Sequence, residues 1–449
     1  MNLLRTWAVL VLLAGASCGD SPRTPTELSG ESAQHESVEF SAAEVRRILT
    51  MSPLPPPPEA STNRFADHPA AARLGQWLFF DQQFSVDGQV SCATCHLPEK
   101  AFTDGRTLAR GQDDLTRHTP SLFNVAYNRW FFWDGRADSL WAQALHPFEE
   151  EGEFGLTRLE VIRRVAADPE LAVAYGKIFG PLPELSARAQ ELPAARPVWR
   201  DEEHPQSSAW ASLGEDEAFR INVAFSNLGK AIAAYERLLI SDQSPFDVFV
   251  AGLRAGDSKK MEALSVSAQR GLQLFVGEAR CRVCHHGPLL SDLEFHSIRI
   301  PPLTRELGKD QGRQKGMKRV LEDPFNGVGV YSDDPEGPAV DLLAYLQPRI
   351  RNRGEFKTPS LRNVAVTAPY MHQGQRKTLE DVLHHYSKME EVFDPVPSHF
   401  ETILEPLHLT EDQTNDLLEF LGSLTDLDLD PDLMHQPSSP SLPSEDRSR

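Results

Sequence analysis

The sequence predicts a mainly α-helical protein that consists of two similar halves, with long loops and little strand. Three observations lead to this prediction. The segment TPSLFNVA at residues 119–126 recurs as TPSLRNVA at 358–365, each half contains one Cys-x-x-Cys-His motif, and the clear apolar periodicity has helical spacing. An internal repeat indicates that each copy folds as a similar unit. Strand-like alternation of apolar and polar residues is scarce.

Length and composition indicate a globular chain with more than one core. The chain has 449 residues, of which 40% are hydrophobic and 24% are charged. That length favours two domains flanked by tails. With 45 Lys and Arg against 65 Asp and Glu, the formal charge is -20, which excludes nucleic acid as the main partner. Four of the five cysteines lie in the two motifs, so the cysteines indicate a cofactor rather than a disulfide framework.

The N-terminus has the pattern of a secretory signal peptide over residues 1–18. Arg5 precedes a short apolar run at 7–13, and Ala14-Gly15-Ala16 matches a cleavage site. This run is too short to span a bilayer, and no other window of about 20 apolar residues occurs. Cys18 follows the run like the lipidated cysteine of a lipoprotein, so a lipid anchor and a plain cleaved signal both stay open. We expect a periplasmic or cell-envelope protein.

Composition shifts divide the rest of the chain. Residues 19–60 are polar and Pro-rich, which predicts a linker, and residues 431–449 are Pro- and Ser-rich, which predicts a disordered tail. Between them we expect a first domain at 61–255 and a second at 256–430. The stretch 181–212 has little periodicity and predicts a surface insertion.

Several segments have clear helical patterns. Similar apolar runs at 72–79 and 268–275 precede the two Cys-x-x-Cys-His motifs. Residues 228–239 carry apolar side chains three and four positions apart, and residues 410–424 begin with acidic residues in the first turn. Thr119 follows His96 by 23 positions, whereas Thr358 follows His285 by 73, so the second half contains an insertion.

The motifs at 92–96 (CATCH) and 281–285 (CRVCH) are typical of covalent haem attachment. In this spacing Cys92 and Cys95, or Cys281 and Cys284, bond to the haem, and the histidine that follows binds the iron. Zinc bound by both cysteine pairs and a pair of redox dithiols are the alternatives. Neither explains a histidine directly after each pair, so we expect two cytochrome-c-like haem domains related by internal duplication.

Residues 65–427 resemble the bacterial di-haem cytochrome c peroxidase family, in particular its MauG-like branch. The resemblance rests on residues 91–96 (SCATCH), 132–140 (FWDGRADSL) and 358–370 (TPSLRNVAVTAPY), which occur in the family's order. It implies a peroxide-reacting haem in the first domain, bound by His96, and an electron-transferring haem in the second, bound by His285.

The resemblance also indicates what lies on the side of each iron opposite the motif histidine. For the second haem it indicates Tyr386, fourteen residues after His372, where MauG has tyrosine and the usual peroxidases have methionine. From the residues alone, Tyr386 could equally be a packing aromatic, and His384 or His385 could be the ligand. The first haem's distal histidine is replaced by Gln112, which predicts an open pocket. His146 is either a hydrogen-bonded residue or a further ligand.

Three residues are implied to carry the reaction. Glu153 lies twenty residues after Trp133, at the family's spacing for a proton-transferring carboxylate, and Gln143 matches another pocket position. Without the resemblance, Glu153 is one member of an acidic run at 149–153 that would ordinarily be a solvated face. Trp133 is implied to relay electrons between the haems, whereas Trp130 and Trp141 are expected to pack.

Family members also hold a calcium ion with backbone oxygens and an asparagine. Thr367 and Pro369 match the backbone positions, but His118 stands in place of the asparagine and is a poor ligand for a hard cation. Calcium binding therefore stays open at this point.

These observations predict an exported di-haem c-type peroxidase that reduces hydrogen peroxide. Its electrons would come from a small donor such as a cytochrome c or a cupredoxin, and the acidic charge weakly favours a basic one. MauG-like oxidative maturation of a partner protein and a non-catalytic electron carrier are the alternatives. A homodimer is compatible with the sequence, which does not decide the oligomeric state.

Overall fold

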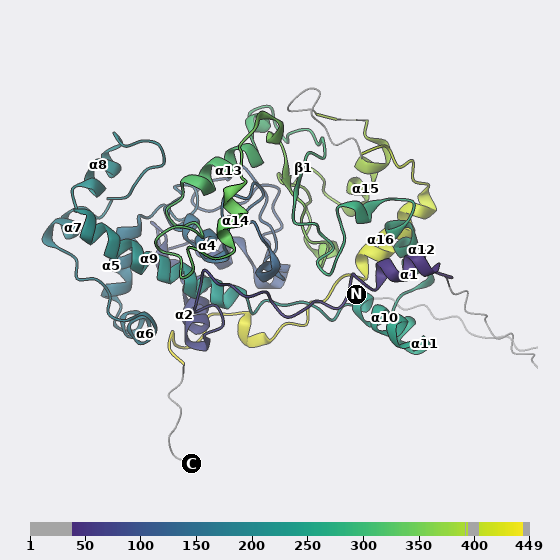
Figure 1. Cartoon of the computed structure of the whole chain (residues 1–449), viewed down its shortest axis with the longest axis horizontal. Helices are drawn as coiled ribbons and strands as arrows, with labels where there is room; N and C mark the ends of the chain where they lie inside the picture. Colours follow the sequence, from purple (N-terminus) through teal and green to yellow (C-terminus); the bar gives the residue numbers. More distant parts are fainter. Residues whose placement is uncertain (1–37, 391, 394–403, 443–449) are drawn as a thin grey trace, which may run out of the picture. The chain divides into compact units, whose positions relative to one another are not determined.

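The computed structural model describes residues 38–390, 392–393 and 404–442. The expected signal peptide, Cys18 and the linker up to residue 37 lie outside the described residues. Within them, regular structure is almost entirely helical (Figure 1). The strands of the described part are β1 (Phe295–His296) and β2 (Phe356–Lys357), which pair antiparallel. The prediction of a mainly α fold with little strand is confirmed.

The helices fall around two apolar cores, one for each half. Those of the first half are α2 (Pro69–Phe80), α3 (Cys92–Cys95), α4 (Leu140–Glu149), α5 (Arg158–Ala167), α6 (Pro169–Phe179), α7 (Ala187–Glu191), α8 (Pro205–Ala211) and α9 (Glu215–Glu236). Those around the second core are α1 (Ala42–Ile48), α10 (Pro245–Ala255), α11 (Ser258–Met261), α12 (Val266–Val276), α15 (Leu379–Lys388) and α16 (Glu411–Gly422). The insertion of the second half contributes α13 (Arg313–Glu322) and α14 (Ala339–Ala344). No helix in the described part of the chain is long and apolar enough to cross a membrane.

The two halves repeat one close helix crossing. In the first, Gly75 of α2 lies against α9 so tightly that an added Cβ would stand 1.9 Å from the carbonyl oxygen of Ala231. In the second, a Cβ on Gly271 of α12 would stand 1.9 Å from the carbonyl oxygen of Asp416 on α16. Only glycine lets the two backbones approach so closely. The helix runs predicted before each motif are thus confirmed as α2 and α12, and each packs on a long partner helix.

The predicted periodic segments form α9 and α16. Leu228, Ile232 and Tyr235 are fully buried on α9, as their spacing predicts. The helix α16 begins at the capping residue Thr410, whose hydroxyl accepts a hydrogen bond from Gln413 N while the Gln413 side chain accepts one from Thr410 N. Acidic residues in its first turn favour the positive end of the helix dipole.

Core packing differs from the expected linker and domain limits. Ile48 of α1 and Phe246 and Phe249 of α10 are fully buried in the second core, although α1 lies in the expected linker and α10 in the expected first domain. The composition of 19–60 concealed this short helix, because a capped helix of seven residues with one buried isoleucine has no extended apolar pattern.

The described part of the expected tail also packs. Tyr235 Oη donates to the carbonyl oxygen of Leu433 over 2.6 Å, and Arg73 Nε donates to that of Ser439 over 2.9 Å. Leu433 and Met434 contact the first core. Residues 431–442 are therefore held by backbone acceptors rather than disordered, and such acceptors leave no signature in the composition.

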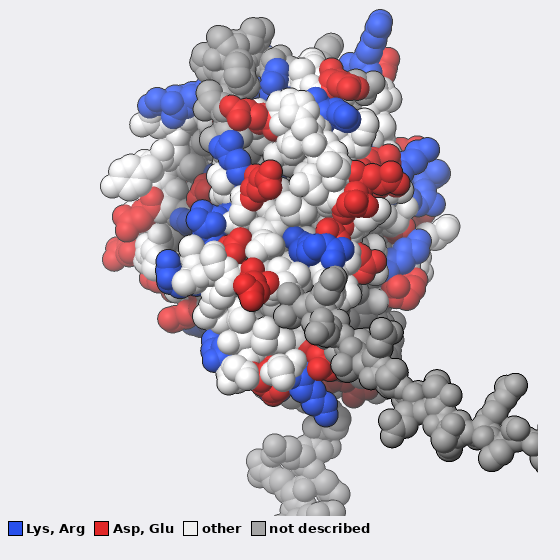
Figure 2. Space-filling model, turned by 90° about the vertical axis from the view of Figure 1, so that its right-hand side faces the viewer, with Lys and Arg blue, Asp and Glu red and all other residues white. Residues whose placement is uncertain are grey.

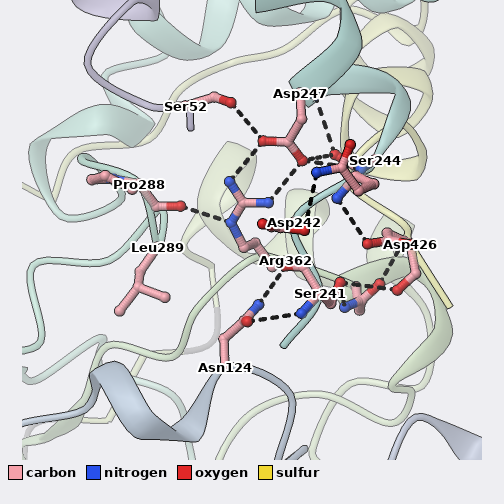
Figure 3. A network of polar contacts seen from close by, with 12 residues as sticks. Ser52, Asn124, Ser241, Asp242, Ser244, Asp247, Pro288, Leu289, Arg362 and Asp426 are labelled. Atoms are coloured by element: carbon pink, nitrogen blue, oxygen red, sulfur yellow. Dashed lines mark hydrogen bonds and ion pairs between the residues drawn. The ribbon is translucent and has the colours of Figure 1, made fainter. Parts of the chain in front are cut away.

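A polar network joins the halves next to both copies of the TPSL repeat (Figure 3). Asn124 and Asn363, at equivalent repeat positions, both bind Ser241 between α9 and α10: Asn124 Nδ2 donates to its carbonyl and Asn363 Nδ2 to its hydroxyl, each over 2.8 Å. Arg362 forms two hydrogen bonds of 2.9 Å with the buried carboxylate of Asp247. The repeated motif therefore also fastens the halves together.

The insertion in the second half lies on the first half. Gly316 of α13 meets the turn after Trp133 so closely that an added Cβ would stand 2.0 Å from the carbonyl oxygen of Asp134. Arg313 at the start of α13 donates to the carbonyl of Gly135 over 2.8 Å. The extra residues that separate His285 from Thr358 thus cover the FWDGR segment of the other half.

Candidate functional site

Both Cys-x-x-Cys-His motifs open into one cavity of about 1140 Å³. Its lining includes Cys95 and His96 from the first motif and Cys281, Cys284 and His285 from the second. The four motif cysteines are free thiols without a disulfide. Burial raises the pKa of the Cys95 and Cys281 thiols to about 12, so both are protonated and uncharged at neutral pH.

The two motif histidines are held in the same way. His96 Nδ1 lies 2.9 Å from the carbonyl oxygen of Phe102, and His285 Nδ1 lies 2.9 Å from that of Leu290. Both acceptor residues have a positive φ, of 58° and 55°, which turns their carbonyls back toward the ring. Burial lowers the pKa of both imidazoles. Each ring is therefore neutral with Nδ1 engaged, which leaves Nε2 to bind a metal.

These features fit a haem at each motif. The cavity lining brings a neutral imidazole together with Cys95 in the first half and with Cys281 and Cys284 in the second. It also contains cations that can meet the carboxylates of a haem. Lys357 is one of them: its Nζ donates to the carbonyl of Trp130 over 3.1 Å, and burial lowers its pKa to about 8. A sequence search for thiols and histidines does not find Lys357, because its only signal is a position next to the repeat.

Glu153 lies in the first half of this cavity. It follows α4 in a turn held by its own N–H, which donates to Glu150 O, and by its carbonyl, which accepts from Gln112 N over 3.1 Å. Burial raises the pKa of its carboxyl group to about 7, although the charge of Arg136 opposes this shift. Glu150 is exposed at the rim. The acidic run is therefore not uniform, because its last member points into the cavity.

The other predicted residues of the first pocket divide into two groups. Gln143 and Pro147 of α4 line the cavity beside Glu153. Gln112 does not, since its side chain donates to Asp87 over 2.8 Å at the surface. His146 also lies outside the lining: it is on α4 with Nε2 3.1 Å from a carboxylate oxygen of Asp323. His146 is therefore in contact with a carboxylate outside the cavity, which does not favour a role as an iron ligand.

Trp133 lies where the two halves of the cavity meet. Its Nε1 donates to the carbonyl of His118 over 2.8 Å, and its own carbonyl accepts from Lys357 N of β2 over 2.8 Å. Trp141, by contrast, is fully buried in the first core, and Trp130 packs against Arg313 outside the cavity. Of these three tryptophans only Trp133 faces the cavity.

Tyr386 of α15 lines the second half of the cavity, and burial raises the pKa of its hydroxyl well above the usual value. The adjacent histidines, His384 and His385, do not line the cavity. His384 is exposed, and His385 is turned away, with Nε2 3.0 Å from the carbonyl oxygen of Ile298. Among the three candidate ligands on this helix, the geometry favours Tyr386.

His118, Thr367 and Pro369 also line the cavity. His118 Nδ1 lies 2.7 Å from the carbonyl oxygen of Arg106, and its backbone N–H donates to His372 O over 2.9 Å. The ring thus already has a backbone partner. Among the described residues, the side chains of Cys284, Asp292 and His296 form a group that could hold a metal ion.

A set of arginines around the cavity was not predicted. Arg117 bridges two carboxylates, Asp134 at 2.9 Å and Asp310 at 2.8 Å, and so links the first half to the insertion of the second. Arg136 pairs with Asp134 at 3.1 Å and stacks on Phe132. Surface arginines are common, so only the fold distinguishes these from solvated charges.

Comparisons with known proteins agree with this geometry. A family model described as di-haem cytochrome c peroxidase matches residues 69–255. The methylamine utilization protein MauG of Methylorubrum extorquens is 31% identical over 358 residues, which cover 79% of this chain and 78% of that protein. The cytochrome-c peroxidase IdrP1 of Denitromonas iodatirespirans is 31% identical over 396 residues, which cover 86% of this chain and 88% of that relative.

A solved structure shows the same fold. The diheme peroxidase BthA from Burkholderia thailandensis aligns with a TM-score of 0.60 and 21% sequence identity, over 87% of this chain and 92% of that one. At this identity the likeness concerns the arrangement of the helices.

Proposed function

The chain belongs to the di-haem cytochrome c peroxidase family, and from this premise we propose that it is an exported peroxidase that reduces hydrogen peroxide in the first half of the cavity. It is an oxidoreductase of the di-haem peroxidase type, and the family implies two c-type haems. In this proposal Cys92, Cys95 and His96 hold the first haem, Cys281, Cys284 and His285 hold the second, and Tyr386 is the second haem's further ligand. When bound, the first haem supplies an iron that can bind peroxide and exchange electrons.

The observation that carries the proposal is the position of Glu153. Its carboxyl group is buried in the same cavity as His96 and has a pKa raised to about 7. A carboxyl group with this pKa can accept a proton and return it near neutral pH. Glu153 is therefore suited to take a proton from hydrogen peroxide and give it to the oxygen that leaves as water. Gln143 lies beside it and can orient the peroxide by hydrogen bonding.

Trp133 is suited to pass electrons between the halves. It faces the cavity where both halves contribute to the lining, and it is fixed by hydrogen bonds to His118 and Lys357. A fixed indole has an oxidisable ring at a constant distance from both motifs. In the proposed reaction the electrons enter from a donor protein, pass through the second half and reach the first by way of Trp133.

MauG-like oxidative maturation of residues on a partner protein is the second candidate. Tyr386 favours it, because an oxygen donor in the cavity stabilises higher iron oxidation states. A non-catalytic electron carrier is the third, but a carrier gives no reason to bury a carboxyl group beside an open pocket.

The donor would be a small cytochrome c or a cupredoxin. The net charge of -20 favours a basic partner. Figure 2 shows one face of the molecule, on which Lys and Arg are interspersed with Asp and Glu without a large patch of one sign. Steering of a basic donor would therefore come from the field of the whole chain rather than from this face. The location in the periplasm or cell envelope, the lipid anchor at Cys18, the calcium ion and a homodimer belong to the proposal.

One experiment distinguishes the candidates. Purified holoprotein is mixed with hydrogen peroxide, with and without a reduced small cytochrome c, and the absorbance of the haems and of the cytochrome is followed. A peroxidase consumes reduced cytochrome in proportion to the peroxide added. A maturation enzyme reacts with peroxide but leaves the cytochrome reduced, and a carrier does not react with peroxide at an appreciable rate.

A further inference from the structure

We propose that Arg319 on α13 is an anion-binding residue of the first half of the cavity, where it takes a carboxylate group, and that Trp199 positions its guanidinium. The inference rests on the proposed function in one respect, because a haem at the first motif would be the nearest source of a carboxylate. It concerns a residue outside both motifs, in the insertion of the second half.

Arg319 is a cation in the cavity without a carboxylate partner. It is partly buried and lines the cavity together with Arg136 and Lys315. Among the described residues, no Asp or Glu oxygen lies within the 4.0 Å of an ion pair to Arg319, whereas most of the cavity's other arginines have such a partner. A guanidinium removed from water without a counter-ion is costly, so this arrangement indicates a site for an anion.

The charges of Asp323, Glu150 and Asp134 all act on Arg319, and two of these carboxylates have other partners. Asp134 is shared by Arg117 at 2.9 Å and Arg136 at 3.1 Å. Asp323 lies 3.1 Å from His146. Neither is available to neutralise Arg319 without losing its present partner. Glu150 forms no ion pair with Arg319 and is exposed at the rim, where solvent screens its charge. A carboxylate that enters the cavity would be free of such competition.

Trp199 holds Arg319 without neutralising it. The guanidinium carbon of Arg319 lies 4.4 Å from the centre of the Trp199 ring. The indole Nε1 of Trp199 donates to a carboxylate oxygen of Glu322 over 2.8 Å, at the end of the same helix. A cation–π contact fixes the position of a guanidinium and leaves its N–H donors for a ligand. This gives a role to the stretch 181–212, which the sequence predicts only as a surface insertion.

The contact between α13 and the turn at Asp134 fixes the position of Arg319 relative to Arg136. Gly316, one turn before Arg319, makes the close contact with the carbonyl of Asp134. Arg136 follows Asp134 by two residues and lies with its guanidinium carbon 3.4 Å from the centre of the Phe132 ring. Burial lowers the pKa of Arg319, and the like charge of Arg136 lowers it further. An anion between them would remove this repulsion.

The carboxylate has two conceivable sources, a propionate group of the first haem or a small free carboxylate from solution. Both give the same contact with Arg319. They differ in whether the site is already occupied in the holoprotein, and this difference can be measured.

The test uses the holoprotein and spectroelectrochemical titration of each haem. Replacement of Arg319 by Gln should lower the reduction potential of the first haem and leave that of the second unchanged, because a nearby positive charge stabilises the reduced iron. Arg319→Lys should restore part of the shift. The matched control is Lys318→Gln, which removes one charge from the same helix at a position that does not line the cavity. Trp199→Phe should shift the potential in the same direction as Arg319→Gln but less.

Titration of the wild-type protein with sodium acetate separates the sources. If a haem propionate occupies the site, acetate leaves the first haem's potential unchanged; if the site takes a free carboxylate, acetate shifts it with saturation, and Arg319→Gln abolishes that shift. Equal potentials in Arg319→Gln and Lys318→Gln, with both haems retained, would overturn the inference. Because potentials are measured without peroxide, an absent peroxide reaction would refute the proposed function while this result still stands.

Discussion

Trp133 and His118 are joined by a hydrogen bond of 2.8 Å from the indole Nε1 to the main-chain carbonyl. The N–H of His118 donates in turn to the carbonyl of His372, over 2.9 Å. Trp133 is thus connected through one residue to the second half of the chain. This bond orients the indole in the cavity and gives its N–H an acceptor.

Replacement of Trp133 by Phe tests the relay. Phenylalanine retains an aromatic ring but is much harder to oxidise and cannot donate to His118. We expect slower oxidation of the reduced second haem after peroxide is added, measured by stopped-flow absorbance. The unsatisfied carbonyl should also cost about 1–3 kcal/mol of unfolding free energy. Trp141→Phe is the control: it loses the 3.1 Å bond to Thr62 in the first core and should leave the electron transfer rate unchanged. Equal rates in both variants would contradict a relay through Trp133.

Removal of the thiols tests covalent attachment at each motif separately. Cys92→Ala combined with Cys95→Ala should leave one haem on the chain after acid-acetone extraction, and so should the double replacement of Cys281 and Cys284. The mass of the denatured protein, with the absorbance of its haem, gives the count. Cys95, Cys281 and Cys284 line the cavity, whereas Cys92 packs against the first core, so the Cys92 replacement is the one expected to affect packing. Wild-type protein that gives up both haems on extraction would show that neither is covalently held.

The elements that could be predicted from the sequence are those with a local signal. The motif cysteines, the helix runs before them and the TPSL repeat all have fixed spacing, and α2, α12, α9 and α16 form where these patterns predict them. The position of Tyr386 in the cavity came from the resemblance, since nothing in the periodicity of α15 distinguishes it from His384 or His385.

What could not be predicted depends on contacts between distant residues. Arg319 and Trp199 are 120 positions apart and meet only because Gly316 lets α13 approach the turn at Asp134. The packing of residues 431–442 depends on hydrogen bonds from Arg73, Gln76 and Tyr235 to backbone carbonyls, which any sequence supplies. The composition of residues 431–442 predicts disorder, because backbone carbonyls that accept hydrogen bonds are present in every sequence and do not change its composition.

Tyr386→Phe tests the proposed ligand of the second haem. Loss of the hydroxyl should open that side of the iron to solvent, so the ferric absorption and electron paramagnetic resonance spectra should change. Tyr370→Phe is the matched control, since Tyr370 also lines the second half but its hydroxyl already donates to the carbonyl of Val364 over 3.0 Å. If the two variants have the same spectra as the wild type, the ligand is a different residue.

The buried pair of Arg362 and Asp247 should contribute strongly to stability. Removal of one partner from a buried ion pair costs about 3–5 kcal/mol, so Arg362→Met should lower the unfolding free energy by that order. The control Arg220→Met breaks the exposed pair with Asp216 and should cost about 0–1 kcal/mol. Chemical denaturation of the holoprotein measures both. A cost of Arg362→Met as small as that of Arg220→Met would contradict the prediction.

The same pair predicts a dependence of stability on pH. Burial alone would raise the pKa of Asp247, but the hydrogen bonds and charge of Arg362 hold it below the ordinary value of 3.8. A carboxyl group with a lowered pKa in the folded state stabilises the fold above its unfolded pKa, and this stabilisation is lost as the pH falls through the folded pKa. The difference in stability between the wild type and Asp247→Asn should therefore be largest near pH 7 and shrink in acid. A difference that grows in acid would have the wrong sign.

Glu153 separates a peroxidase from an electron carrier with an open iron. Glu153→Gln keeps the size of the side chain but cannot accept a proton, so the peroxide reaction should slow by about 10²–10⁴-fold. With the pKa raised to about 7, the rate in the wild type should rise with pH through this value, because the ionised form accepts the proton, and the variant should lose this rise. Burial makes ionisation of Glu153 unfavourable in the folded state, so Glu153→Gln should be no less stable than the wild type at neutral pH.

Two neighbours make this test specific. Glu151 is exposed and pairs with Arg196, so Glu151→Gln should leave the peroxide rate unchanged. Glu150 lies at the rim, and its charge raises the pKa of Glu153, so Glu150→Gln should keep the rate but move its pH dependence to lower pH. Stopped-flow measurement between about pH 5 and pH 9, a range that brackets the expected pKa, gives both quantities. Similar small losses in all three variants would mean that Glu153 acts as ordinary surface charge, and the proton would then have to be carried by another group near Gln143.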